Sequence, residues 1–246
     1  MTTLLLRLAG PLQSWGDSSR FTQRGTADAP SKSGVVGLLA AALGRRRIDP
    51  IEDLFGLRFG VRIDQPGRIE RDFQTAQTLD KSHAFPLTHR FYRADAVFLA
   101  GVESDDGALV RALDDAVRRP TFPLYLGRRS CPPVGPLTLG VHDEPLGALL
   151  ARWPWQAAPW WKRRHGHETD VLLDVAVDDG VRVPGTVDDD ATMTTRHDAP
   201  LSFDPVHRTY GWRTVRRHGI AVPNDTAVAR TAPPPPHDPM SVLGDA

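Results

Sequence analysis

The sequence has one cysteine, no long hydrophobic run and no leader-like start. Because Cys131 stands alone, no internal disulfide is possible, and the chain fits a reducing compartment. The apolar run from Leu4 to Ala9 is short, is interrupted by Arg7 and leads into GPLQSWG, which does not resemble a signal-peptide cleavage site. The sequence contains no run of about 18 apolar residues, the length that a membrane-spanning helix needs. We therefore expect a cytoplasmic protein with no membrane partner.

Common catalytic and cofactor motifs are also missing. There is no P-loop, no glycine fingerprint of dinucleotide binders and no GxSxG element. His165 and His167 in HGHE resemble a metal-binding pair, but no second ligand cluster accompanies them, and the basic residues before them favour a solvated loop. Cys131 has no CxxC partner and is expected to pack as a small thiol. The sequence thus predicts neither a metal nor a cofactor.

Charge is balanced in total but polarised along the chain. The 246 residues carry 30 basic and 30 acidic side chains. Residues 1–48 have a net charge of +5, whereas residues 140–200 have a net charge of −5. Such a chain could hold phosphates with its first part, although an unevenly charged solvated surface explains the pattern equally well.

Apolar periodicity predicts two β-α-β units separated by a polar excursion over residues 64–92. Ser31 or Ser33 is expected to cap the first helix, which Gly44 ends. Ser104 is expected to cap the second helix, which Pro120 ends. This order is that of a ferredoxin-like, or RRM-like, α+β domain. Strands are expected over residues 4–9, 57–63, 94–102 and 137–141.

The composition of the sequence changes near residue 140. Four tryptophans cluster around prolines in residues 153–161, and LLDVAV at residues 172–177 is typical of a strand. We therefore expect a ferredoxin-like domain over residues 1–139 and a small β-rich C-terminal domain over residues 140–225. A stiff, proline-rich tail is expected over residues 226–246.

Two groups of polar residues stand where a two-layer domain usually binds its ligand. Gln13, Ser14 and Trp15 follow the first strand; Trp offers a face for base stacking, and Gln and Ser can bind base edges. The alternative, that the tryptophan anchors the core, is equally open. Lys32 and Ser33 begin a helix, where free N–H groups favour a phosphate, although a simple cap and a solvated lysine fit as well.

A third group follows the glycine of LYLG. Arg128, Arg129 and Ser130 lie in a turn that could present two guanidinium groups to a phosphate backbone. Two arginines in an ordinary surface turn are the plainer interpretation. The hypothesis of a binding site depends on the convergence of all three groups, which are far apart in sequence.

A catalytic alternative comes from the polar excursion. Lys81, His83, His89 and Tyr92 supply the base, acid and cation that a metal-independent ribonuclease needs. The same residue types suit a hairpin that only grips RNA, so both interpretations stay open.

Several sequence blocks, in this order and spacing, resemble one family. GPLQSWG (residues 10–16), SKSGVVGLLAAALGR (31–45), DFQT (72–75) and PLYLGRRSCPP (123–133) are similar to the CasD family, the fifth family of Cas subunits, in type I-E CRISPR Cascade complexes. The closing HDPM (237–240) is similar too. The resemblance covers roughly residues 4–136, and residues 140–200 cannot be matched.

The resemblance implies a ferredoxin-like domain with a protruding β-hairpin thumb, here at about residues 71–92. It implies RNA contacts from all three groups above. On the thumb, Arg71, Gln74 and Arg90 are the expected contacts. Charge and position add Arg20, Arg24 and Arg45 to the candidates.

The family resemblance also implies partners. The expected protein is a non-catalytic subunit that binds the five-prime handle of the CRISPR RNA (crRNA) and caps one end of the backbone filament in antiviral defence. Its neighbours would be the Cascade backbone subunit, the large subunit that reads the protospacer-adjacent motif, and target DNA near the handle-proximal end. The rivals are a metal-independent endoribonuclease that processes precursor crRNA and a scaffold that binds only proteins.

Overall fold

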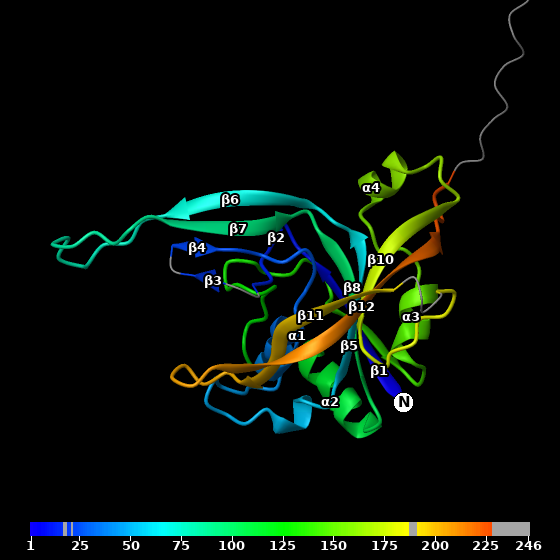
Figure 1. Cartoon of the computed structure of the whole chain (residues 1–246), viewed down its shortest axis with the longest axis horizontal. Coiled ribbons are helices and arrows are strands. Elements are labelled where there is room, and N and C mark those ends of the chain that lie inside the picture. The colour runs from blue at the N-terminus through cyan, green and yellow to red at the C-terminus, as the bar shows by residue number, and fades with distance from the viewer. Residues whose placement is uncertain (17–18, 21, 187–190, 228–246) are drawn as a thin grey trace, which may run out of the picture.

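Seven strands form one antiparallel sheet in the order β11-β12-β10-β5-β8-β1-β9 (Figure 1). The computed structural model describes residues 1–16, 19–20, 22–186 and 191–227. The protein is thus a mixed α/β structure with a large antiparallel sheet and few helices. The strands are β1 (Thr2–Ala9), β5 (Arg58–Gln65), β8 (Val97–Ser104), β9 (Thr138–His142), β10 (Asp170–Asp178), β11 (Thr192–Ser202) and β12 (Thr209–Pro223).

Both faces of this sheet are covered, which explains the continuous apolar run in β1. Successive side chains of a strand point to opposite faces. Leu4, Leu6 and Leu8 accordingly belong to one hydrophobic cluster, together with helices α1 (Lys32–Ala42) and α2 (Gly107–Arg118). Leu5 belongs to a second cluster, with helix α3 (Leu146–Arg152). A short α4 (Pro159–Arg164) follows, and a 3-10 turn, η1 (Glu52–Leu54), lies between α1 and β5.

Local capping chemistry sets the helix ends. Ser31 caps α1, because its Oγ accepts a hydrogen bond from Gly34 N at 3.2 Å, and Gly44 follows the helix with φ of +80°. Both features confirm the sequence predictions. The predicted cap at Ser104 is wrong: Asp106 caps α2 by accepting hydrogen bonds from Ala108 N and Leu109 N. Ser104 instead accepts a hydrogen bond from the N–H of Asp106.

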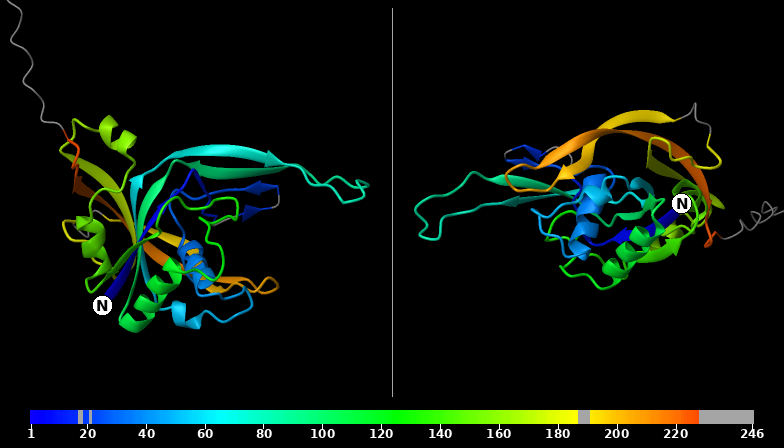
Figure 2. Two further views of the ribbon diagram at one scale, coloured as in Figure 1. Left: turned by 180° about the vertical axis from the view of Figure 1, so that it is seen from behind. Right: turned by 90° about the horizontal axis from the view of Figure 1, so that it is seen from below.

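The polar excursion forms a long hairpin of β6 (Arg68–Gln74) and β7 (Thr88–Ala94), which projects from the body of the protein (Figures 1 and 2). Three short strands from the N-terminal loop join it in a second sheet. These are β2 (Leu12–Gln13), β3 (Ser19–Arg20) and β4 (Gln23–Arg24), and the sheet order is β2-β7-β4-β3. The loop after the first strand is therefore placed against the base of the hairpin.

The C-terminal strands continue the main sheet. Strand β10 pairs with β5, with Val175 opposite Arg62, and β11 and β12 then curve across helix α1 (Figure 2, right). The predicted boundary near residue 140 thus falls between parts that share a sheet, and the division into two domains stays a prediction. Residues 188–190 and most of the predicted tail lie outside the described residues. None of the described helices is both long and apolar enough to cross a membrane.

A fully buried ion pair holds the second half of the chain to strand β5. Arg62 donates to Asp64 at 2.7 and 2.8 Å, and both side chains are 0% exposed. The remaining donors of Arg62 reach the carbonyl oxygens of Leu150, Trp153 and Pro154 at 2.7 to 3.0 Å. One guanidinium group therefore provides hydrogen-bond donors for backbone carbonyl groups at the end of α3 and in the segment that follows it.

We predict that Arg62→Met lowers the free energy of unfolding by about 3 to 5 kcal/mol, because Asp64 would stay buried without its counterion. Urea denaturation measures this change. The exposed pair of Arg152 and Glu144 gives a matched control, since Arg152→Met should cost less than about 1 kcal/mol. Equal effects of the two changes would contradict the structural role of Arg62.

Candidate nucleic-acid interface

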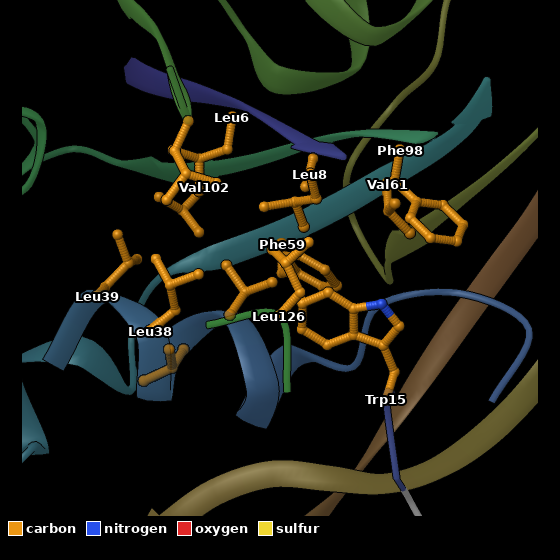
Figure 3. Close-up of a cluster of buried hydrophobic side chains, with 14 of the residues drawn as sticks. Leu6, Leu8, Trp15, Leu38, Leu39, Phe59, Val61, Phe98, Val102 and Leu126 are labelled. Atoms are coloured by element: carbon orange, nitrogen blue, oxygen red, sulfur yellow. The ribbon is translucent and has the colours of Figure 1, made fainter. Parts of the chain in front are cut away.

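The first predicted group, Gln13 to Trp15, lies inside the protein. Trp15 is 1% exposed and packs among core side chains such as Leu126 (Figure 3). Its Nε1 donates to Gln13 Oε1 at 3.0 Å, and Gln13 Nε2 donates to the carbonyl oxygens of Leu8 and Ala96. Ser14 is 3% exposed, and its Oγ donates to the carbonyl oxygen of Phe91. The prediction that these side chains stack on or bind a base is therefore wrong for this structure; they anchor the core.

The second predicted group, Lys32 and Ser33, already has partners within the protein. Lys32 is 9% exposed, and its Nζ lies 2.9 Å from Asp178 Oδ2. Its backbone N–H donates to Asp198 Oδ2 at 2.9 Å, so a carboxylate of the chain already occupies the helix N-terminus. Ser33 is half-buried, with its Oγ 3.4 Å from Ser31 Oγ. A phosphate at this helix start would have to displace an internal carboxylate.

Arg213 completes this arrangement, which we call the buried ion network: Lys32, Asp178, Asp198 and Arg213. The guanidinium of Arg213 contacts Asp178 at 2.5 Å and Asp198 at 2.6 and 3.0 Å, and it lies over the ring of Phe59. Two cations meet two carboxylates, so the network is neutral. It joins the start of α1 to β10, β11 and β12 and has a structural role.

We predict that Lys32→Met destabilises the protein by about 3 to 5 kcal/mol, because it leaves Asp178 with a single cationic partner in a buried site. Thermal or urea unfolding measures the loss. The folded fraction of the variant should bind RNA with the same salt dependence as the unchanged protein. A flatter salt dependence would show instead that Lys32 contacts phosphate.

The third predicted group is placed by a glycine. Gly127 has φ of +84°, and a Cβ at this position would lie 1.8 Å from the carbonyl oxygen of Ser14. The loop carrying Arg128 therefore packs directly on the loop carrying Ser14. Arg128 donates to the carbonyl oxygens of Phe91, Arg24 and Gly25. Its guanidinium also lies 4.8 Å from the ring centre of Tyr92, whereas Arg129 and Ser130 are exposed.

Strand register brings further arginines to the same place. Arg24 of β4 is paired with Arg90 of β7, and Tyr92 lies two residues further along β7 on the same face. Because Arg128 covers Tyr92, the side chains of Arg24, Arg90 and Arg128 belong to one face of the hairpin sheet, which we call the arginine face. Asp72 opposite Arg90 is its nearest carboxylate by register. The Nε of Arg90 is buried and has no hydrogen-bond partner among the described residues.

The other predicted RNA contacts are scattered. Arg45 forms an ion pair with Asp53, which raises the pKa of the guanidinium through the hydrogen bond between them. Gln74 and Arg71 are exposed on β6, with Gln74 on the arginine face and Arg71 on the opposite one. Arg20 lies in β3, and its side chain is outside the described part of the chain.

The four catalytic candidates do not form one constellation. Lys81 and His83 are exposed in the loop at the end of the hairpin. His89 and Tyr92 lie three residues apart on β7 and therefore point to opposite faces. Tyr92 is 4% exposed beneath Arg128. Cys131 is buried, and burial raises the pKa of its thiol, which fits the predicted packing role.

Sequence reasoning missed the partners of these residues. Asp178, Asp198 and Arg213 had no motif to mark them. The one available signal is the alternation in β12, where Arg213, Val215 and Arg217 recur every second residue and so share a face. That alternation does not identify the helix against which the face packs.

The chain is similar to proteins of CRISPR systems. A family model described as CRISPR-associated protein (Cas5) matches residues 3–216. The CRISPR system Cascade subunit CasD of Escherichia coli (strain K12) is 37% identical over 169 residues, covering 60% of this chain and 75% of that protein.

Two solved structures share the fold over nearly the whole chain. A chain of a CRISPR RNA-guided surveillance complex matches with a TM-score of 0.73 and 33% identity, covering 92% of this chain and 93% of its own length. A crystal structure of a Cas protein matches with a TM-score of 0.66 and 36% identity, covering 92% of this chain and 97% of the other.

Proposed function

Because the chain belongs to the Cas5 family of CRISPR-associated proteins, we propose that it is a non-catalytic Cascade subunit whose arginine face binds the five-prime handle of the crRNA. The observation that supports this site most strongly is the unpartnered Nε of Arg90. A buried guanidinium nitrogen without a partner is costly, and a phosphate oxygen would satisfy it with a charge-assisted hydrogen bond. Arg24 and Arg128 stand beside it on the same face.

The arginine face suits unpaired RNA held by its backbone. Arg128 is already bound to three carbonyl oxygens, so it holds the loop and adds positive charge, while the exposed Arg129 and Ser130 remain available for contacts. Gln74 on the same face can bind a base edge. Phosphate contacts would supply affinity, and base contacts would set the register of the handle.

The strand order supports a finer interpretation of the fold. Elements β1-α1-β5-β8-α2-β9 follow one another, and their strands lie in the order β5-β8-β1-β9, as expected for a ferredoxin-like domain. The β6–β7 hairpin would be the thumb, and β10–β12 would form the C-terminal domain. In the assembled complex the chain would contact a backbone subunit, the large subunit that reads the protospacer-adjacent motif, and target DNA near the handle, in the cytoplasm.

We predict that Arg90→Gln and Arg129→Gln each weaken binding of a synthetic handle RNA roughly tenfold, because each removes a charge-assisted hydrogen bond. Each should also reduce the slope of log affinity against log salt by about 0.7, the effect of one lost phosphate contact in a single strand. Fluorescence anisotropy across a salt series measures both quantities. Arg47→Gln is the control, because Arg47 is exposed in the turn after α1.

The alternatives give different results. Unchanged affinity and slope in a folded Arg90→Gln would contradict the arginine face as the RNA site. Cleavage of precursor RNA in EDTA by the unchanged protein, lost in His89→Ala, would contradict the non-catalytic role. Purification of the complex without a protected RNA end at this subunit would favour a scaffold that binds only proteins.

A further inference from the structure

A second group of arginines surrounds one carboxylate where the hairpin meets the main sheet. Asp28, in the loop before α1, receives a hydrogen bond from Arg196 of β11 at 2.9 Å, and Arg217 of β12 lies 2.5 Å away. Arg93 of β7 reaches the same loop, because its Nε donates to the carbonyl oxygen of Ala27 at 3.1 Å. We call these four residues the Asp28 cluster: Asp28, Arg93, Arg196 and Arg217.

The charge of this cluster is not balanced. The cluster contains three guanidinium groups and one carboxylate, of which Arg196 and Arg217 contact Asp28, whereas the buried ion network has equal numbers of cations and carboxylates. Burial lowers the pKa of Arg93, and Arg217 lowers it further, while Asp28 acts in the opposite direction. The cluster thus holds more positive charge than its own carboxylate can neutralise.

The Asp28 cluster is also open to solvent, unlike the buried ion network. The side chains of Asp28, Arg217 and Arg196 are 36%, 28% and 17% exposed. An incoming anion can therefore reach them without unfolding the sheet. Guanidinium groups present paired donors that match the oxygens of a phosphate, which makes a phosphate the anion best suited to this site.

The adjoining face of the hairpin indicates what kind of phosphate-containing ligand the cluster would bind. Arg93 lies on the side of β7 opposite to Arg90 and is paired with Ile69 of β6. The residues of this face are Ile69, Arg71, Phe73, His89, Phe91 and Arg93, and none is acidic. Phe73 is 66% exposed, so a cationic strip with an available aromatic ring leads away from the cluster, as single-stranded nucleic acids require.

We propose that the Asp28 cluster binds a backbone phosphodiester of the RNA, as a second site on the opposite face of the hairpin from the arginine face. The proposal rests on the proposed function, because it assigns another segment of the same RNA. Asp28 holds Arg196 and Arg217 in position and limits the affinity of the site by its own charge. Arg93 supplies the cation that Asp28 does not hydrogen-bond.

The direct test is to remove the carboxylate. With a synthetic handle RNA and the full-length protein, Asp28→Asn should tighten binding about fivefold, the effect of removing one like charge at contact distance. Arg196→Gln should weaken binding and reduce the salt slope by about 0.7. Arg111→Gln and Asp143→Asn are matched controls, since this exposed pair lies on α2 and just after β9, and neither change should alter affinity.

Tighter binding by Asp28→Asn cannot result from partial unfolding, so it supports the site even if Arg196→Gln folds poorly. Unchanged or weaker binding by a folded Asp28→Asn, while Arg90→Gln still weakens binding, would overturn this inference and leave the proposed function intact. If neither Asp28→Asn nor Arg90→Gln changes RNA affinity, both this inference and the proposed function are contradicted. Loss of a protein neighbour from the complex with unchanged RNA affinity would assign the cluster to a protein carboxylate and would also overturn the inference.

Discussion

The buried ion network of Lys32, Arg213, Asp178 and Asp198 is the interaction on which the arrangement of the protein depends. It joins the start of α1, which packs on one face of the main sheet, to the three C-terminal strands. Removing a partner from such a network is costly, because the remaining charge stays buried. The network therefore fixes where β11 and β12 cross α1, and this crossing in turn brings Arg196 and Arg217 to Asp28.

Internal pairing also explains why charge polarised along the chain does not make the whole N-terminal part a phosphate site. Basic residues of the first segment meet acidic residues of the later one, as Lys32 meets Asp178, or meet local partners, as Arg45 meets Asp53. What remains for a ligand is a smaller set around the hairpin. The arginine face and the Asp28 cluster belong to it because their cations outnumber the carboxylates beside them.

Local features could be predicted from the sequence, whereas burial could not. The strand at Leu4, the cap at Ser31 and the helix end at Gly44 depend on neighbours within a few residues, and each is confirmed. The family resemblance, carried by short blocks in the right order, is confirmed as well. The blocks did not indicate that Gly127 and Arg128 pack on the loop after β1, because that contact joins residues more than 100 positions apart.

The roles of Trp15 and Lys32 depend on residues far away in the chain. Trp15 packs against Gly34 and Leu126, and Lys32 meets carboxylates from β10 and β11, so only the fold decides between core and ligand contact. The most direct test of which residues contact RNA and which belong to the core is photocrosslinking of handle RNA to the protein, with mapping of the crosslinked peptides. The account predicts crosslinks at Arg24, Arg90 and Arg129 and none at Trp15 or Lys32. Crosslinks confined to residues 13–15 and 32–33 would contradict it.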